Sequence, residues 1–203
     1  MLLLPFGAPA DLPAARASVR MALANHGVVA IPTESSYGLA ANPFDPKGVA
    51  AVFLAKGRSA EKALPLVAAS LAQVELFAVV EPAWRRRLSS AWPAPLSIVL
   101  TTRSADISGP TVAVRVPSHP LLCGLLHATG PLTATSANRS GEPPALSGDV
   151  VAAVFSASVA FLLDGGVLAG GPPSTVVDAS GPIPRLLRAG AFTVPPEWGV
   201  KAV

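Results

Sequence analysis

Residues 14–32 read AARASVRMALANHGVVAIP, the pattern of a helix followed at once by the pattern of a strand. Small apolar residues recur at helical spacing over 14–26, and Gly27 follows them, as glycine does at many helix ends. Residues 28–31 are a continuous apolar run closed by Pro32, which is typical of a strand buried on both faces. This order of elements predicts an α/β protein.

The same alternation continues along the chain. Further helices are predicted over 47–56, 81–91, 119–127 and 146–156, and further strands over 64–68, 96–100, 111–116, 131–134, 159–163, 175–177 and 185–187. Such alternation predicts a sheet with helices packed on it, mixed rather than purely parallel. Because no repeat and no long linker interrupts the pattern, we expect residues 1–203 to form a single domain. The tail after Pro195-Pro196 is expected to be poorly ordered.

The composition excludes several classes of protein. Of 203 residues, 51% are hydrophobic and 13% charged, whereas a disordered chain needs low hydrophobicity and high net charge. Cys123 is the only cysteine, so neither an intrachain disulfide nor a four-thiolate zinc site can form, which fits a reducing compartment. No histidine has zinc-ligand spacing and no Gly-x-Ser-x-Gly elbow occurs. We therefore expect neither a protein metal site nor a serine hydrolase.

Neither a membrane span nor a targeting segment is predicted. The longest apolar windows, 64–80 and 150–163, are interrupted or closed before they reach the ~18–20 apolar residues that cross a bilayer. Residues 1–5 lack the basic start of a signal peptide, so a cytoplasmic protein is expected. The net charge of +3 permits anionic ligands but does not by itself indicate nucleic acid.

Polar residues gather in five short regions between the expected strands, where loops can carry ligands. Residues 32–39 (PTESSYGL) form a hydroxyl-rich turn after a strand, where open α/β sheets bind ligands. An ordinary loop bonded to its own backbone is the alternative. Residues 56–62 (KGRSAEK) hold three cations and a glycine, which suits a polyphosphate although Walker A spacing is missing. Here the alternative is a solvated helix end.

The other regions lie further along the chain. Arg115 stands among apolar residues in TVAVRVP, so it either pairs with an internal acid or awaits a carboxylate or phosphate. Residues 133–141 (TATSANRSG) can form an anion nest or a simple capping turn. The fifth region is the pair 174–178 (STVVD) and 187–190 (LRAG), weak signals when taken singly. The basic run 85–87 is either a solvated helix face or part of an RNA-docking patch.

Taken in order, these regions resemble the YrdC/Sua5 family, the L-threonylcarbamoyladenylate synthases that make the activated intermediate for the t6A modification of tRNA. The resemblance covers roughly residues 15–191. The family patterns are Pro-Thr-Asp-Thr-x-Tyr-Gly-Leu, Lys-x-Arg-Pro-x-x-Lys-Pro-Leu, Ala-Val-Arg followed by His-Pro, Thr-Ser-Ala-Asn-x-Ser-Gly, Ser-Thr-x-x-Asp and Leu-Arg-x-Gly. Each pattern is a modest signal, but six in register make a specific match.

This chain departs from the family patterns at four positions. Glu34 stands where aspartate is usual, Ser59 and Ala63 stand in place of prolines, and Ala94 replaces a common glycine. Because prolines stiffen a loop, we expect their absence to loosen the cationic loop 56–62 and to affect turnover more than the fold. The chain resembles the short single-domain form of the family.

The resemblance implies a twisted mixed α/β sheet with a concave, positively charged face. It also implies a nucleotidyltransferase that joins L-threonine, bicarbonate and ATP into threonylcarbamoyl-AMP and pyrophosphate, with Mg²⁺ held through the ATP phosphates. Lys56 and Arg58 are expected to be catalytic, because fixed cations stabilise charge that develops on phosphate. Threonine is expected to contact Thr33, Arg115 and Ser174. The residues expected at the nucleotide are Lys56, Arg58, Lys62, Thr111, Thr135, Ser136, Asn138, Ser140 and Arg188.

Two other functions remain open on the sequence alone. One is a non-catalytic module that binds double-stranded RNA on the same concave basic face. The other is a carbamoyl-transfer domain like that of hydrogenase maturation proteins, although their acylphosphatase-like and zinc-finger regions are missing from this sequence. For the enzyme, tRNA and the proteins of a threonylcarbamoyl-transferase complex are the expected macromolecular partners.

Overall fold

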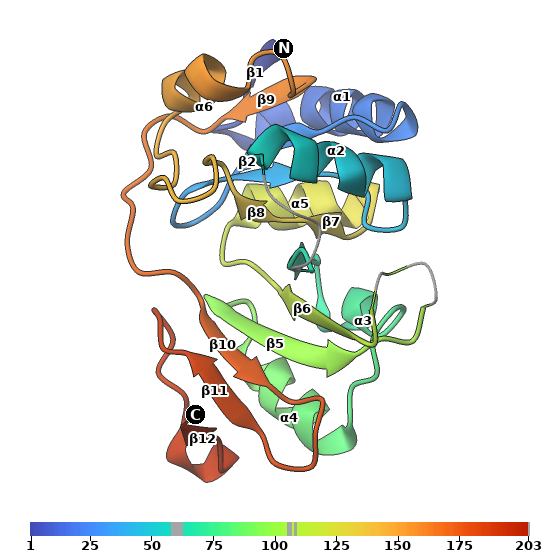
Figure 1. Cartoon of the computed structure of the whole chain (residues 1–203), viewed down its shortest axis with the longest axis vertical. Helices are drawn as coiled ribbons and strands as arrows, with labels where there is room; N and C mark the ends of the chain where they lie inside the picture. Colours follow the sequence, from blue (N-terminus) through green and yellow to red (C-terminus); the bar gives the residue numbers. More distant parts are fainter. Residues whose placement is uncertain (58–62, 105–106, 108, 203) are drawn as a thin grey trace.

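The strands form two mixed sheets, which lie one above the other in Figure 1. The computed structural model describes residues 1–57, 63–104, 107 and 109–202. The upper sheet has the order β1 (Leu2–Pro5), β9 (Phe161–Asp164), β2 (Val29–Pro32), β3 (Tyr37–Ala40) and β8 (Thr135–Ser136). The lower sheet has the order β12 (Lys201–Ala202), β11 (Arg185–Arg188), β10 (Thr175–Asp178), β5 (Leu96–Thr101), β6 (Thr111–Arg115), β4 (Leu66–Val67) and β7 (Leu132–Thr133). The expected mixed α/β architecture is confirmed, but the strands divide between two sheets rather than forming one.

Helices cover both faces of the upper sheet. On one face, α1 (Leu12–Ala24) and α5 (Pro120–Thr129) pack against one set of apolar strand residues, and on the other face lie α2 (Pro46–Lys56) and α6 (Gly148–Phe155). In β2, Val29 and Ile31 point to the first core and Ala30 to the second. Because both faces are buried, this strand needs apolar residues at every position, which explains its continuous run.

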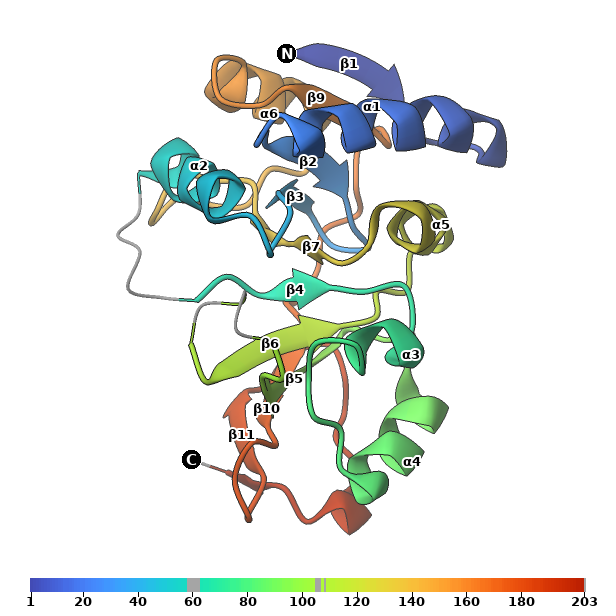
Figure 2. The ribbon, with the colours of Figure 1, turned by 90° about the vertical axis from the view of Figure 1, so that its right-hand side faces the viewer.

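The lower sheet is covered by helices on one face. Figure 2 shows α3 (Leu71–Val74) and α4 (Pro82–Ala91) to one side of it. Their side chains Val74, Trp84 and Leu88 pack with the inward residues of β5, β6 and β10 in a third core. The other face of this sheet carries partly exposed residues of β6, including Arg115. At β4 and β7 this second face packs through Val67 and Leu132 into the core of α1 and α5. Its part over β6, β5, β10 and β11 is therefore the part that is available for ligands.

The C-terminal segment packs onto the lower core. The 3₁₀ helix η2 (Pro196–Trp198) buries the Trp198 ring against Trp84, with 5.5 Å between the ring centroids in an edge-to-face arrangement. Strand β12 then pairs with β11. The expectation of a poorly ordered tail is wrong, because the Trp198 ring, two residues after Pro196, packs on the lower core and fixes the tail. A second 3₁₀ helix, η1 (Pro9–Asp11), precedes α1. Within the described part of the chain, every helix is too short or too polar to cross a membrane.

Candidate functional site

A row of residues crosses four strands on the face of the lower sheet opposite α3 and α4. In β6, Val114 belongs to the core beside α4, so Arg115 points to the opposite face. In the antiparallel register of β5 and β6, Ile98 pairs with Val114, so the next residues along the two strands, Ser97 and Arg115, lie on the same face at this end of the pair. Val176 of β10 pairs with Ser97, and Arg188 of β11 pairs with Val176. Pairing in register therefore brings two arginines from distant parts of the chain onto one surface.

Arg115 forms an ion pair with Glu34, which lies in the turn between β2 and β3. Its Nη1 donates to Glu34 Oε1, and the two side chains are 14% and 22% exposed. Burial, and to a smaller extent the positive charge of Arg188, lowers the pKa of Arg115 to about 10. The sequence left open whether Arg115 pairs with an internal acid or awaits a ligand. In the structure it has an internal acid, and it also faces a second cation.

Arg188 is held by the segment that leads into β10. Its Nε and Nη2 donate to the Ser174 carbonyl oxygen at 3.0 and 2.9 Å, and Nη2 also donates to Ser174 Oγ at 3.2 Å. Ser174 Oγ lies 2.9 Å from Ser97 Oγ. The two weak C-terminal motifs are therefore joined to each other and to β5 by direct hydrogen bonds.

Gly190 allows this contact because it has no side chain. A Cβ at this position would lie 2.2 Å from the Pro173 carbonyl oxygen and 2.6 Å from the Thr175 nitrogen. No heavy-atom contact of that length is tolerated, so the backbone after β11 approaches the Ser174 segment only with glycine here. The glycine of the Leu-Arg-x-Gly motif thus has a structural cause.

Thr33 uses its hydroxyl to close the turn that presents Glu34. Thr33 Oγ1 donates to the Ser36 carbonyl oxygen at 2.7 Å and accepts from the backbone N–H groups of Ser35 and Ser36, both at 3.3 Å. The residue is 4% exposed. Its side chain therefore holds a rigid turn next to Arg115, as the ordinary-loop alternative predicted, while the turn also lies at the candidate site.

Lys56 binds several oxygen atoms of the polar loop that begins at β8. This lysine ends α2, is 4% exposed, and its Nζ donates to the Ser136 carbonyl oxygen and to the carbonyl and side-chain oxygens of Asn138, the last two at 2.9 and 3.3 Å. Ser136 Oγ donates to Asn138 Oδ1, and Ser140 N donates to the Lys56 carbonyl oxygen at 3.2 Å. Two predicted regions, 56–62 and 133–141, therefore meet. Arg58 and Lys62 lie outside the described residues.

Thr111 and Thr135 occupy other surroundings. Thr135 is 6% exposed and pairs with Leu39 between β8 and β3. Thr111 begins β6, at the end of the strand far from Arg115. It lines a mostly apolar cavity of about 430 Å³ between α2 and β6, together with Leu64 and Thr133. The structure thus separates Thr111 from the Arg115 and Arg188 cluster along one strand.

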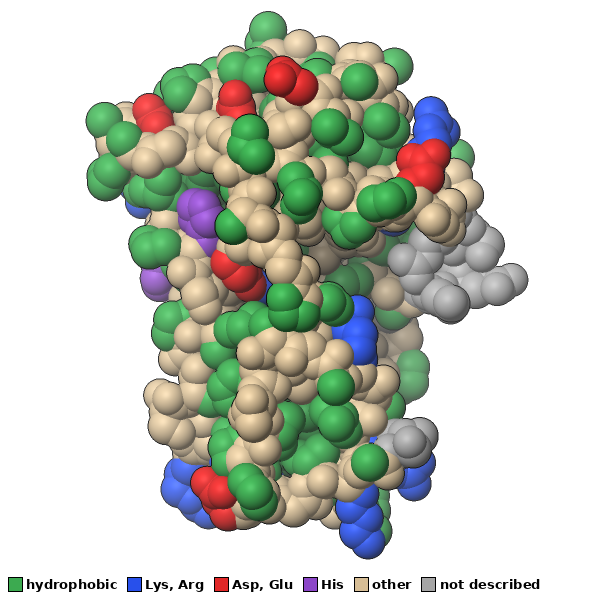
Figure 3. Space-filling view, turned by 90° about the vertical axis from the view of Figure 1, so that its left-hand side faces the viewer, with side chains coloured by type: hydrophobic (Ala, Val, Ile, Leu, Met, Phe, Trp, Pro, Cys, Tyr) green, Lys and Arg blue, Asp and Glu red, His purple; other side chains and the backbone are tan. Residues whose placement is uncertain are grey.

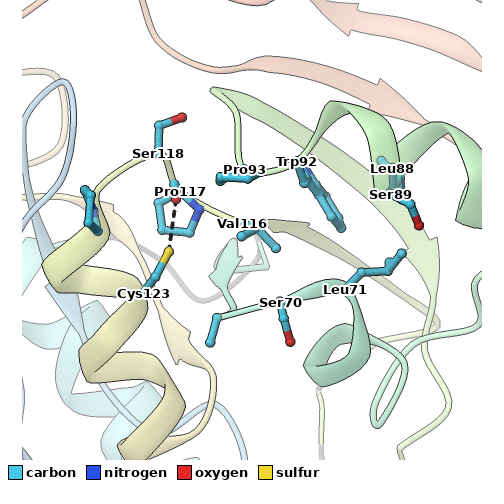
Figure 4. Close-up of a pocket in the computed structure, with 12 residues that line it drawn as sticks. Ser70, Leu71, Leu88, Ser89, Trp92, Pro93, Val116, Pro117, Ser118 and Cys123 are labelled. Carbon is cyan, nitrogen blue, oxygen red and sulfur yellow. Dashed lines mark hydrogen bonds between the residues drawn. The ribbon is translucent and has the colours of Figure 1, made fainter.

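A different cavity lies on the helix side of the lower sheet. Figure 4 shows it between α3, α4 and the start of α5, with Trp92 and Val116 at its apolar wall. Its volume is about 480 Å³, and Cys123 reaches its edge with Sγ 3.1 Å from the Pro117 carbonyl oxygen. It contains none of the residues predicted from sequence, so it is separate from the candidate site.

Tyr37 is a polar core residue that the sequence reasoning did not single out. It is fully buried, and its hydroxyl oxygen lies 3.0 Å from Asp164 Oδ1 and 2.8 Å from the Gly166 carbonyl oxygen, which share its single O–H as acceptors. The same oxygen accepts from Gly165 N at 3.0 Å. Burial, and then the hydrogen bond to Asp164, raises the pKa of Tyr37 to about 12. Tyr37 is the only tyrosine of the sequence and lies in the stretch 32–39 (PTESSYGL). These two facts were the only sign in the sequence that it has a special role.

The surface does not show one basic patch on the face drawn in Figure 3, where Lys and Arg side chains are scattered among apolar and neutral ones. The concave positive face stays a prediction.

In the basic run 85–87, Arg85 pairs with Glu75 at 2.5 Å and Arg87 lies 4.8 Å from the Trp84 ring centroid. Two of these arginines therefore have partners within the protein. No group of three His, Cys, Asp or Glu side chains suited to a metal occurs in the described ranges.

Comparison with known proteins identifies relatives along most of the chain. The family model Sua5_yciO_yrdC, described as "Telomere recombination", matches residues 21–190. Threonylcarbamoyl-AMP synthase of Pyrococcus abyssi is 39% identical over 172 residues, which are 81% of this chain and 51% of that protein. The Bacillus subtilis protein of the same name is 35% identical over 179 residues, 84% of this chain and 52% of that protein. The chain thus spans about half the length of these two relatives.

Solved structures agree with this grouping. The crystal structure of P. abyssi Sua5 complexed with L-threonine superposes with a TM-score of 0.87 at 31% identity, covering 100% of this chain and 63% of that one. Escherichia coli YciO gives a TM-score of 0.82 at 22% identity, covering 96% of this chain and 97% of that one, and shows the shared fold. The model match over 21–190 and these relatives show that the chain belongs to the Sua5/YciO/YrdC family.

Proposed function

We propose that this protein makes L-threonylcarbamoyladenylate from L-threonine, bicarbonate and ATP, with release of pyrophosphate, for the t6A modification of tRNA. The observation that carries the proposal is the placing of Arg115, Arg188 and Ser174 on one face of the lower sheet, beside the Thr33 turn. Relatives named threonylcarbamoyl-AMP synthase and a related structure described with L-threonine support it.

The reaction sets clear demands on the site. The threonine nitrogen forms a bond to the bicarbonate carbon, and water is lost, which gives a carbamate. A carbamate oxygen then forms a bond to the α-phosphorus as the bond to pyrophosphate breaks. Negative charge develops on phosphate oxygens in this second step, so fixed cations and correct positioning contribute more than a general base does.

Arg115 is the proposed partner of the threonine carboxylate. Its guanidinium is planar and presents several donors, of which one is used by Glu34. Ser174 and Thr33 are the proposed further contacts to the amino acid. Since the hydroxyl of Thr33 already closes its own turn, we expect its contribution to be mainly that of holding Glu34 and the turn backbone in place.

The cations proposed for the triphosphate come from two regions. Arg188 lies on the same face as Arg115, and Lys56 sits under the 135–140 loop, with Arg58 and Lys62 following in sequence. Because Lys56 already binds loop oxygens, we propose that it shapes the loop and shares its charge with a phosphate. The remaining proposed nucleotide contacts are Thr111, Thr135, Ser136, Asn138 and Ser140.

Mg²⁺ is proposed to enter with ATP. It prefers oxygen ligands and keeps several of its waters, so phosphates and water can complete its coordination. The described side chains offer it no acidic cluster, which supports coordination mainly by the nucleotide. The product would then pass to a protein that transfers the threonylcarbamoyl group to tRNA.

Pyrophosphate release tests the proposal. Purified protein should release pyrophosphate only when L-threonine, bicarbonate and ATP are all present, and the nucleotide product should carry the threonine carbon skeleton. Release that does not depend on threonine would contradict the proposal. If no pyrophosphate forms and the protein binds RNA with a steep salt dependence that ATP does not alter, the RNA-binding module is the better description.

A further inference from the structure

The Glu34 carboxylate has one oxygen in use and one without a partner. Oε1 accepts a hydrogen bond from Arg115 Nη1, whereas Oε2 is buried and has no hydrogen-bond partner among the residues that the structure describes. A buried carboxylate oxygen without a donor is costly. An unfilled acceptor of this kind, at the edge of a candidate binding site, is a place where a ligand donor is expected.

The position of Glu34 is fixed from two sides. The Thr33 hydroxyl closes the turn that carries it, and Arg115 of the lower sheet holds it through a hydrogen bond. The two side chains are 22% and 14% exposed, so both remain in contact with the open face. The pair therefore presents a negative and a positive group side by side at the same edge.

An α-amino acid carries the matching charges on two groups that are attached to the same carbon atom. Its carboxylate suits the guanidinium donors that Glu34 leaves free, and its amino group is a donor for the free oxygen of Glu34. We propose that Glu34 Oε2 accepts a hydrogen bond from the amino group of the amino-acid substrate while Arg115 binds the substrate carboxylate. This inference rests on the proposed function, and it assigns Glu34 as the residue that selects for the amino group.

The assignment is compatible with the chemistry of the nitrogen. The ammonium group first releases one proton to solvent, and a second hydrogen leaves with the bicarbonate hydroxyl as water when the N–C bond of the carbamate forms. The nitrogen then keeps one hydrogen, which can still be donated to Glu34. The carbamate oxygens are then left free for attack on phosphorus. In this arrangement Glu34 holds the nitrogen through the reaction and need not take up a proton.

A competing arrangement makes a different prediction. If Glu34 merely occupies Arg115 until a substrate carboxylate displaces it, removing the charge of Glu34 should tighten the binding of every carboxylate ligand. If Glu34 binds the amino group, the same change should weaken only ligands that have one. L-Threonine and 3-hydroxybutanoate, which lacks the amino group, separate these two arrangements.

The test is calorimetric titration of the full chain with both ligands. Wild-type protein should bind L-threonine at least about tenfold more tightly than 3-hydroxybutanoate, as expected for a charge-assisted hydrogen bond. E34Q keeps the shape of the side chain and should lose most of that difference by weakening threonine alone. The matched control is E75Q, because Glu75 is also 22% exposed and also pairs with an arginine, Arg85, far from the site. E75Q should bind both ligands as the wild type does.

Four outcomes would overturn the inference. Equal wild-type affinity for the two ligands would do so without any variant, and so would tighter binding of both ligands by E34Q. Wild-type protein that binds threonine and releases pyrophosphate, while a folded E34Q binds threonine equally well, would refute the role of Glu34 and leave the proposed function intact. Wild-type protein that binds no threonine would refute both.

Discussion

At the scale of the residue, Arg115 is largely buried and yet keeps its positive charge at neutral pH. Removal from water and the neighbouring Arg188 lower its pKa to about 10, which is still far above neutral pH. The side chain therefore stays cationic while it is poorly hydrated. A cation in this condition binds an anion more strongly than a surface arginine does, because less water has to be displaced and the local dielectric constant is lower.

Replacing Arg115 should affect one substrate selectively. Arg115→Ala is expected to weaken L-threonine binding by about 2–5 kcal/mol, since a buried charge contact is lost, with a much smaller effect on ATP. Titration of each ligand separately measures the two effects. Arg185→Ala is the control, because Arg185 is an exposed residue of β11, which β10 and β5 separate from β6 in the same sheet. Equal losses for threonine and ATP would show that Arg115 has a general structural role instead.

Replacing Gly190 should disturb the site without touching a ligand. Gly190→Ala places a methyl group where the Pro173 carbonyl oxygen lies 2.2 Å away, so strands β10 and β11 must move apart. A loss of about 1–3 kcal/mol in the free energy of unfolding is expected from such overpacking, together with weaker ligand binding. Gly181→Ala, where a Cβ meets nothing within 4 Å, should leave both quantities nearly unchanged. Chemical denaturation and titration of the two variants make the comparison.

At the scale of the element, helix α2 supports the loop that Lys56 binds. Asp45 caps its first turn by accepting from the backbone N–H groups of Lys47 and Gly48 at 3.1 and 3.2 Å. His26 Nδ1 lies 2.7 Å from Asp45 Oδ2 and connects this cap to the end of α1. Gly57, with a φ of 60°, ends the helix in the left-handed conformation that glycine adopts readily.

The cap should make stability depend on acid pH. The hydrogen bond from His26, followed by those from the backbone, lowers the pKa of Asp45 below its ordinary value of 3.8. A lowered carboxyl pKa stabilises the fold above the unfolded-state value, and this contribution is lost as the pH falls through the folded-state value. The cost of Asp45→Asn to the free energy of unfolding should therefore be constant above about pH 5 and shrink in stronger acid. Urea denaturation across this range measures it.

A second variant checks the cause of that pH dependence. His26 has a φ of 58°, a conformation that asparagine tolerates, so His26→Asn removes the imidazole without adding strain. The cost of Asp45→Asn should depend less on pH in this background. A cost of Asp45→Asn that does not change with pH in the wild-type background would contradict the account.

Most elements could be predicted from sequence because their patterns are local. The helix over 81–91 and the strand over 96–100 agree closely with α4 and β5. Three upper-sheet strands, β1, β3 and β8, were missed for physical reasons. Strand β3 begins inside the polar stretch 32–39, whose hydroxyl-rich start resembles a loop, and β1 has only four residues, most of them exposed. Strand β8 has only two residues, both inside the polar stretch 133–141. The split into two sheets depends on pairings between distant strands, which no local pattern records.

The candidate site, too, could be predicted only in part: its residues from sequence, but their contacts only from the structure. The polar regions were found from sequence because polar residues are conspicuous in a chain with 13% charged residues. The contacts among them were not predictable. Glu34 and Arg115 are 81 residues apart, and Lys56 reaches Asn138 across 82 residues. Such partners become neighbours only through sheet register, so the acid that neutralises Arg115 could be named only from the structure.

At the scale of the whole molecule, the site connects the two sheets. Glu34 belongs to the turn after β2 of the upper sheet, and Arg115 ends β6 of the lower sheet. A ligand that binds both residues therefore stabilises the relative position of the two halves. Ligand binding should protect the complete fold rather than one local segment.

Substrates should therefore raise the unfolding temperature of the entire chain. At about 100 times its Kd, a ligand that binds only the folded state adds about 2.7 kcal/mol to stability. Differential scanning calorimetry should show one transition that moves upward with threonine, and Arg115→Ala should abolish the shift while Arg185→Ala retains it. Two separate transitions, with only one of them shifted, would show that the sheets unfold independently.

The order of strands in the lower sheet has a consequence for protein synthesis. Strand β10 lies between β5 and β11, and β11 carries Arg188, so the β5 edge of this sheet is covered only by segments that leave the ribosome well after β5 and β6. Until then β5 has an unpaired edge, which invites association with other nascent chains. A ribosome-bound chain that has not yet exposed residue 188 should be both inactive and prone to aggregation, with chaperones as its natural protection.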